Sequence, residues 1–132
     1  MIMRIAATAL LATALLPASA HAATLVTGPN GNRATIRASI DGHHKLTVLI
    51  PSVTDKHGSK CTWVVLLVRR TDGDRRAVPE WRSATNRNCT NRTAGLPTFT
   101  RGDVKRAWAQ LCVSRSAPTR PCSRSWTRLS DR

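Results

Sequence analysis

Apolar and polar residues alternate along the segment 33–40, and this alternation predicts a half-buried β-strand. The residues that share its apolar face are Ala34, Ile36, Ala38 and Ile40. Asp41-Gly42 predicts a tight turn, and the apolar segment 45–50 forms the returning strand. Residues 51–60 are mostly polar and predict a loop. The first third of the domain is therefore expected to be an antiparallel hairpin.

A second hairpin is expected from the apolar, β-branched segment 61–70. Asp72-Gly73 predicts a two-residue type I′ turn, and residues 75–81 return along the first strand. This turn places Val68 opposite Ala77. Both side chains then lie on one apolar face of the hairpin.

The return strand and the segment after it carry residues that disfavour central strands. Pro79 has no backbone N–H to donate, so its strand is predicted at a sheet edge. Residues 83–98 contain several asparagines together with Gly95 and Pro97, and they predict an irregular connection. Cys89 can tether this connection through a disulfide.

The segments 104–113 and 122–129 also alternate and predict a last antiparallel hairpin. If Cys112 faces Cys122, the register places Trp108 opposite Trp126, and directly opposed aromatic residues stabilise a sheet. The other opposed pairs in this register are Gln110–Arg124 and Arg106–Arg128. The residues on the opposite, apolar face are Ala107, Ala109, Leu111 and Val113.

No segment shows a convincing helical period over ten or more residues. About six or seven short strands separated by turns predict an all-β fold, a small antiparallel β-sandwich or barrel. The chain has no internal repeat and no long linker, so these strands are expected to form one domain.

The start of the chain has the order of a secretory signal peptide. A basic residue, Arg4, precedes the apolar run 5–16, and Ala20-His21-Ala22 supplies small residues at a cleavage site. The run is too short for a bilayer core, which needs about twenty residues. We expect residues 1–22 to be removed, which leaves residues 23–132 as a single β-rich secreted domain with no transmembrane segment. Cleavage after Ala20 is an alternative.

Four cysteines lie downstream of the signal peptide: Cys61, Cys89, Cys112 and Cys122. An even number in a small exported chain predicts two disulfides, and the spacings are unlike those of zinc sites. We prefer the pairing 112–122 with 61–89. The pairings 61–112 with 89–122 and 61–122 with 89–112 stay open.

The chain is strongly basic, with 21 lysines and arginines against seven acidic residues and a net charge of +14. This charge predicts attraction to polyanions such as nucleic acid or cell-wall polymers. Arginines interleaved with aromatic residues suit binding to bases or sugars. The candidate binding residues are Arg106, Trp108, Arg124, Trp126 and Arg128. In the alternative interpretation, the two tryptophans and the cystine form a layer of the core and the arginines extend from its rim.

Few residues offer catalytic or metal-binding chemistry. The residues that resemble metal ligands are Asp41, His43, His44 and His57, and their positions also suit polar loops. Glu80 is the only glutamate, and no motif of a known nucleophile or metalloprotease appears. We therefore expect no enzyme activity, no cofactor and no metal.

The loop between Cys112 and Cys122 has a second interpretation. Its segment Ser114-Arg115-Ser116-Ala117-Pro118 resembles the reactive loop of Bowman–Birk trypsin inhibitors, in which a basic residue precedes a serine inside a disulfide ring. The resemblance implies that Arg115 is the specificity residue and Arg115–Ser116 the protease-facing bond. A rigid loop of this kind binds tightly because it is preorganised.

In its layout, a signal peptide followed by a small domain with four cysteines, the chain resembles small secreted proteins of actinomycetes that have no assigned activity. We expect a non-catalytic binding or envelope-associated protein. Its partner is expected to be an anionic polymer, either cell-wall polymer or nucleic acid, or else an extracellular protein. A serine-protease inhibitor is the first alternative, and a small hydrolase or toxin is the second.

Overall fold

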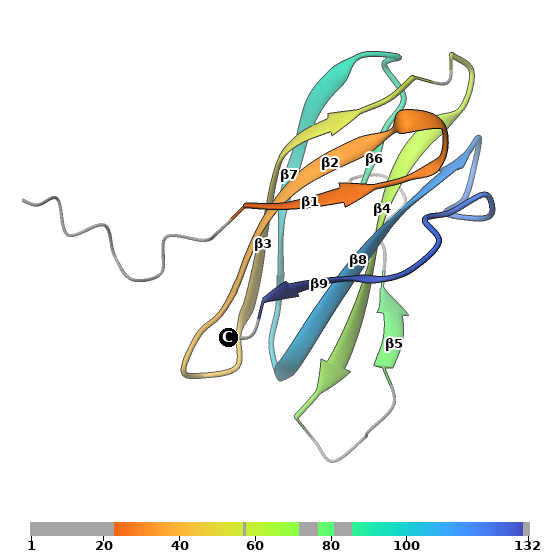
Figure 1. Ribbon diagram of the computed structural model, residues 1–132. Coiled ribbons are helices and arrows are strands. Elements are labelled where there is room, and N and C mark those ends of the chain that lie inside the picture. Colours follow the sequence, from red (N-terminus) through yellow and green to blue (C-terminus); the bar gives the residue numbers. More distant parts are fainter. Residues whose placement is uncertain (1–22, 57, 72–76, 81–85, 131–132) are drawn as a thin grey trace, which may run out of the picture.

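Two antiparallel β-sheets pack face to face in the computed structural model, which describes residues 23–56, 58–71, 77–80 and 86–130 (Figure 1). Its elements are β1 (Ala23–Thr27), the 3-10 turn η1 (Pro29–Gly31), β2 (Arg33–Ile40), β3 (Leu46–Thr54), β4 (Cys61–Arg70), β5 (Ala77–Glu80), β6 (Arg87–Asn88), β7 (Thr93–Arg101), β8 (Val104–Ser114) and β9 (Thr127–Ser130). Sheet A has the order β1-β2-β3-β7, and sheet B has the order β5-β4-β8-β9 with β6 also paired to β4. The predicted all-β sandwich is confirmed, with nine strands in the described residues where six or seven were expected.

The core lies between the two sheets and is built from the alternating apolar positions of their strands. Sheet A contributes the predicted face of β2, with Ile36 fully buried, and sheet B contributes Leu66 and Leu111. Burying one such aliphatic side chain stabilises the fold by about 1.5–3 kcal/mol. The predicted inner face of β8 is also correct: the buried residues are Ala107, Ala109, Leu111 and Val113.

Strand β3 continues through Pro51 to Thr54, so the prediction of a loop from residue 51 is wrong at its start. A proline in a central strand is tolerated here because the ladders on both sides of β3 shift register around it. Gly95 on β7 lies beside this proline: a Cβ there would stand 3.1 Å from the Pro51 carbonyl oxygen. The glycine therefore permits the close approach of the two strands.

The expected irregular connection 83–98 is wrong in its second part, because Thr93–Arg101 forms strand β7 at the edge of sheet A. Pro97 fits this edge position, since a missing N–H there breaks no ladder with a further strand. Pairing with β3 gives the backbone of this segment its hydrogen-bond partners, although its own residues do not favour a strand. Strand β5 lies at the edge of sheet B, as Pro79 predicted.

The register of β5 against β4 differs by one residue from the prediction. Val68 lies opposite Val78, whereas Ala77 lies opposite Arg69. A two-residue turn at Asp72-Gly73 would pair Val68 with Ala77, so the observed pairing is offset by one residue. Residues 72 and 73 lie outside the described residues. Because side chains alternate between the faces of a strand, this shift puts Ala77 on the outer face of sheet B.

Both preferred disulfides are confirmed, Cys61–Cys89 and Cys112–Cys122. Cys61–Cys89 joins the start of β4 to the segment after β6, and Cys112–Cys122 joins β8 to the segment before β9. The described residues contain no helix that is long and apolar enough to cross a membrane. The proposed signal peptide, residues 1–22, lies outside them.

Candidate functional site

The outer face of sheet B carries the aromatic and arginine residues that the sequence singles out. On β4, the residues between the core positions are Trp63, Val65, Leu67 and Arg69. On β8, the corresponding residues are Arg106, Trp108, Gln110 and Cys112. The two rows face each other in the pairs Trp63–Cys112, Val65–Gln110, Leu67–Trp108 and Arg69–Arg106.

One half of this outer face is covered and forms a second, smaller core. Its buried members are Cys61, Trp63, Val65 and Cys112. Cys122 and Trp126 pack against them, and the guanidinium of Arg87 lies 5.2 Å from the ring centroid of Trp63. The indole Nε1 of Trp63 donates to the carbonyl oxygen of Ser114 at 3.2 Å, so this fully buried ring also has its polar group satisfied.

The other half of the outer face stays open to solvent. Its members, the Arg–Trp surface from here on, are Leu67, Arg69, Arg106, Trp108 and Arg128. Arg128 is exposed and the other four are half-buried. Trp108 occupies the centre, because β4 places Leu67 opposite it on one side and β9 places Arg128 opposite it on the other.

Two arginines of the Arg–Trp surface, Arg69 and Arg106, stand directly opposite each other. Like charges in this arrangement destabilise a sheet. Within the described part of the chain neither guanidinium has a carboxylate partner, and the residue opposite Arg69 on the far side is Ala77. Lys105, which is exposed, adds charge next to Arg106 at the register shift of β8. The charge that the described residues place at this end of the surface is therefore positive.

The outer face of sheet A is also exposed to solvent, but it has a different composition. Threonine and serine dominate it, and Arg33 and Arg37 are its exposed arginines. Phe99, the aromatic residue in its strands, is buried in the core. The combination of tryptophan with opposed arginines is thus a property of sheet B, and Arg33 and Arg37 provide a matched comparison.

The predicted tryptophan pair is wrong. Cys112 does face Cys122, but Trp108 lies opposite Arg128 and β9 begins only at Thr127. Arg128 therefore does not lie opposite Arg106, and the partner of Arg106 on the other side, on β4, is Arg69. Trp126 covers the smaller core next to the cystine, and Arg124 is exposed on the segment between Cys122 and β9.

Ser123 lies at the point where the ladder breaks. Its hydroxyl oxygen accepts from the Leu111 N–H at 2.9 Å and donates to the Thr27 carbonyl oxygen at 2.6 Å. The hydroxyl thus takes the backbone donor that a continuous ladder would use. The backbone N–H of Ser123 still donates to the Leu111 carbonyl oxygen at 2.8 Å, and the chain leaves the ladder after this residue and rejoins it at Thr127, opposite Ala109.

Of the five candidate binding residues, the fold brings together Arg106, Trp108 and Arg128. Arg69 completes the group and was not predicted from the sequence. The alternation of β4 places Arg69 on the face of Trp63, but only the pairing of β4 with β8 brings it opposite Arg106. That pairing joins strands far apart in sequence and leaves no local signal.

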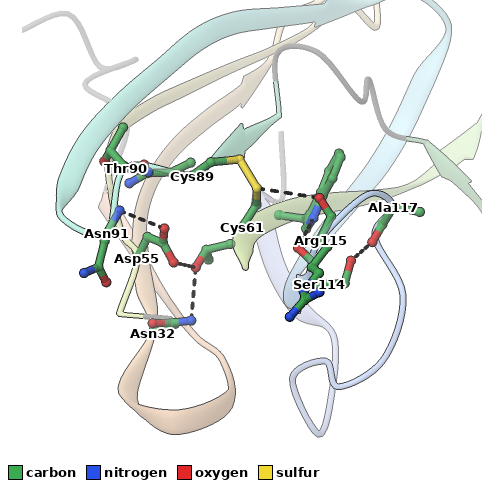
Figure 2. The surroundings of a disulfide bond; sticks show 12 residues. Asn32, Asp55, Cys61, Cys89, Thr90, Asn91, Ser114, Arg115 and Ala117 are labelled. Atoms are coloured by element: carbon green, nitrogen blue, oxygen red, sulfur yellow. Dashed lines mark hydrogen bonds between the residues drawn. A yellow bond between two sulfur atoms is a disulfide. The ribbon is translucent and has the colours of Figure 1, made fainter. Parts of the chain in front are cut away.

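The Cys112–Cys122 loop holds the residues of the inhibitor hypothesis. Ser114 and Pro118 are half-buried, and Arg115 and Ser116 are exposed. The hydroxyl of Ser114 donates to the Ala117 carbonyl oxygen, and the carbonyl oxygen of Arg115 lies 3.9 Å from the Sγ of Cys61 (Figure 2). A protease must reach the carbonyl of the bond that it attacks. Here that carbonyl lies against the disulfide, so the inhibitor hypothesis gains no support and stays a prediction.

Among the residues that resemble metal ligands, Asp41 has a structural role. The carboxylate of Asp41 accepts from the backbone N–H groups of His43 and Lys45, at 2.8 and 3.0 Å. These hydrogen bonds, that of Lys45 above all, lower the pKa of Asp41 below its usual 3.8. The described residues contain no group of three or more potential metal ligands, and His57 and the side chain of Glu80 lie outside them.

A buried polar network beside the Cys61–Cys89 disulfide was not predicted (Figure 2). The carboxylate of Asp55 accepts from the hydroxyl of Thr62 at 3.1 Å and from the backbone N–H of Asn91 at 3.0 Å. The Thr62 hydroxyl oxygen in turn accepts from the amide of Asn32 at 3.0 Å. The network joins the turn before β2, the end of β3 and the start of β4, and it stabilises the fold away from the Arg–Trp surface.

No protein-family model, no curated protein and no solved structure matches this chain. Fold and surface therefore define its class by themselves: a small β-sandwich of two antiparallel sheets with two disulfides and an Arg–Trp surface on one face.

Proposed function

We propose that this protein is an exported, non-catalytic binding protein that recognises an anionic polymer through its Arg–Trp surface. The observation that carries the proposal is the opposed pair Arg69–Arg106 beside Trp108, without a described carboxylate partner, on a chain with a net charge of +14. An anion between two opposed guanidiniums replaces their repulsion by charge-assisted hydrogen bonds. The free energy of the surface is therefore lower with a bound polyanion than without one.

Export is supported by two features of the chain. The first 22 residues have the order of a signal peptide, and both disulfides require an oxidising compartment to persist. Mass spectrometry of the protein from culture medium should give Ala23 as the first residue. A protein retained in the cells with its first 22 residues would contradict export.

Binding is tested with polyphosphate, a polyanion without rings, across a series of salt concentrations. Diffuse and specific electrostatic binding both weaken as the salt concentration rises, because binding of the protein releases counterions from the polyanion into the solution. The double variant Arg69→Ala/Arg106→Ala should lower the affinity about tenfold or more. It should also reduce the slope of log affinity against log salt concentration by about one to two.

The matched control is Arg33→Ala/Arg37→Ala, which removes the same charge from the outer face of sheet A. It should weaken binding by no more than about threefold, as expected for loss of net charge alone. Equal losses in the two double variants would show that binding is diffuse and would overturn the assignment to sheet B.

A further inference from the structure

We infer that the anionic polymer is single-stranded nucleic acid, with a phosphate held between Arg69 and Arg106 and a base stacked on Trp108. The inference rests on the proposed function and names the partner of the same surface. Three relationships carry it: the opposed arginines, the half-buried tryptophan next to them, and the hollow that continues from the same face.

The two arginines are arranged to share one phosphate. Directly opposed residues on antiparallel strands have their Cβ atoms about 4.5–5.5 Å apart, so both guanidiniums reach a single tetrahedral anion. Each guanidinium offers a planar fork of N–H donors that matches phosphate oxygens. Arg69 and Arg106 are half-buried, whereas Arg33 and Arg37 on sheet A are exposed, so the sheet B pair is the more confined in position.

Trp108 provides a stacking surface at a suitable distance from this pair. It lies two residues after Arg106 on the same face of β8, which is about 7 Å along the strand. That distance is within the span of one nucleotide. Leu67 and Arg128 lie opposite Trp108 on the two neighbouring strands, so the indole stands between two side chains of the same face. A base that stacks on such a ring raises affinity by about 5- to 150-fold.

The surface extends beyond Trp108 toward the Cys112–Cys122 loop. Gln110 is the next residue on this face of β8 and lines a hollow with Arg120 and Cys122. From Arg106 to Gln110 the strand covers about 13 Å, enough for two or three successive nucleotides. Arg120 is exposed and supplies a further cation at the far end. Positive charge therefore lies at both ends of this row of residues, and the indole of Trp108 lies between them.

The chemistry of other polyanions fits the surface less well. Bases of a duplex are stacked inside the helix, so an indole on a sheet face cannot reach their planes. A polyphosphate or a polyol-phosphate wall polymer has no aromatic ring and would use the arginines without Trp108. The tryptophan thus distinguishes the partners, and the arginines do not.

The test compares three ligands of matched charge on the mature chain: a twelve-nucleotide oligothymidylate, a duplex and polyphosphate. At about 150 mM salt the oligothymidylate should bind about tenfold or more tightly than either of the others. Trp108→Leu should lower its affinity about 5- to 50-fold, whereas Trp108→Tyr should keep that affinity within about threefold. Near-ultraviolet circular dichroism verifies that each variant is folded.

The outcomes separate the two proposals. If no polyanion binds, the proposed function fails together with this inference. If polyphosphate binds as tightly as the oligothymidylate, or the duplex binds more tightly, the inference is overturned and the proposed function stands. These comparisons use the unaltered protein, so they remain decisive even if a Trp108 variant does not fold.

Discussion

Gly28 lies so close to Leu111 that a Cβ atom at position 28 would stand 2.7 Å from the Cβ of Leu111. Gly28 follows β1 of sheet A, and Leu111 lies in the core on β8 of sheet B. The contact is therefore one of the points at which the two sheets meet. A side chain at position 28 would push them apart.

Gly28→Ala should lower the free energy of unfolding by about 1–3 kcal/mol, because an added methyl group in a packed contact displaces backbone. Urea denaturation followed by fluorescence measures the change. Gly42→Ala is the matched control, since nothing lies within 4 Å of a Cβ at that position. The control should stay within about 0.5 kcal/mol of the original protein. Equal unfolding midpoints for the two variants would contradict the close packing.

The two disulfides should contribute unequally to stability. Cys61–Cys89 closes a loop of sequence separation 28, and Cys112–Cys122 closes one of separation 10. Loop-closure entropy gives about 3.6 kcal/mol for the longer loop and about 2.7 kcal/mol for the shorter one. Denaturation of the double variants Cys61→Ala/Cys89→Ala and Cys112→Ala/Cys122→Ala tests the order. A larger loss from the shorter loop would mean that local packing outweighs chain entropy.

Asp55→Asn should destabilise the protein by about 1–3 kcal/mol, although the side chain keeps its size. Asp55 is 1% exposed, and its two oxygens accept from Thr62 and from the backbone of Asn91. An amide puts N–H donors in place of one acceptor and leaves a buried donor without a partner. A double-mutant cycle with Thr62→Val measures the coupling of the pair.

Asp103→Asn is the control for this change. Asp103 is exposed and has a positive φ of 59°, a conformation that asparagine also adopts readily. It should change stability by less than about 0.5 kcal/mol. If Asp55→Asn is as mild as this control, the buried network does not stabilise the fold.

Asp41 should give the turn between β2 and β3 a dependence on pH. Its folded-state pKa is lowered by the backbone N–H groups of Lys45 and His43, so its carboxylate stabilises the turn above the unfolded-state pKa of about 3.8. That contribution is lost as the pH falls through the lower folded-state value. An NMR titration of the Asp41 carboxyl carbon should place its midpoint below 3.8. Asp41→Asn should abolish the associated shifts of the His43 and Lys45 amide protons, and a midpoint at or above 3.8 would contradict the hydrogen bonds.

The strands predicted best are those whose burial alternates. In β2 and β8 one face enters the core, so the period of two is visible in the residues themselves. Strand β7 was missed because Gly95 and Pro97 disfavour strands locally, and only pairing with β3 compensates. Local preference and tertiary pairing disagree there, and pairing prevails.

The candidate site was predicted in part for a related reason. Arg106 and Trp108 share a strand, so alternation alone puts them on one face. Arg69 and Arg128 join them through strand pairings, and the ladder before β9 breaks at Ser123, whose hydroxyl donates to the Thr27 carbonyl oxygen, 96 residues earlier in the chain. The residues of the last hairpin alone do not indicate that contact. The cystine alone was therefore insufficient to predict the register.

The prolines of the edge strands have a consequence for behaviour at high concentration. β5 and β7 are outermost strands, and they carry Pro79 and Pro97. An incoming strand from another molecule would meet a backbone nitrogen without a proton on either edge, which interrupts the ladder it needs. These two edges therefore resist aggregation by strand addition without help from charge.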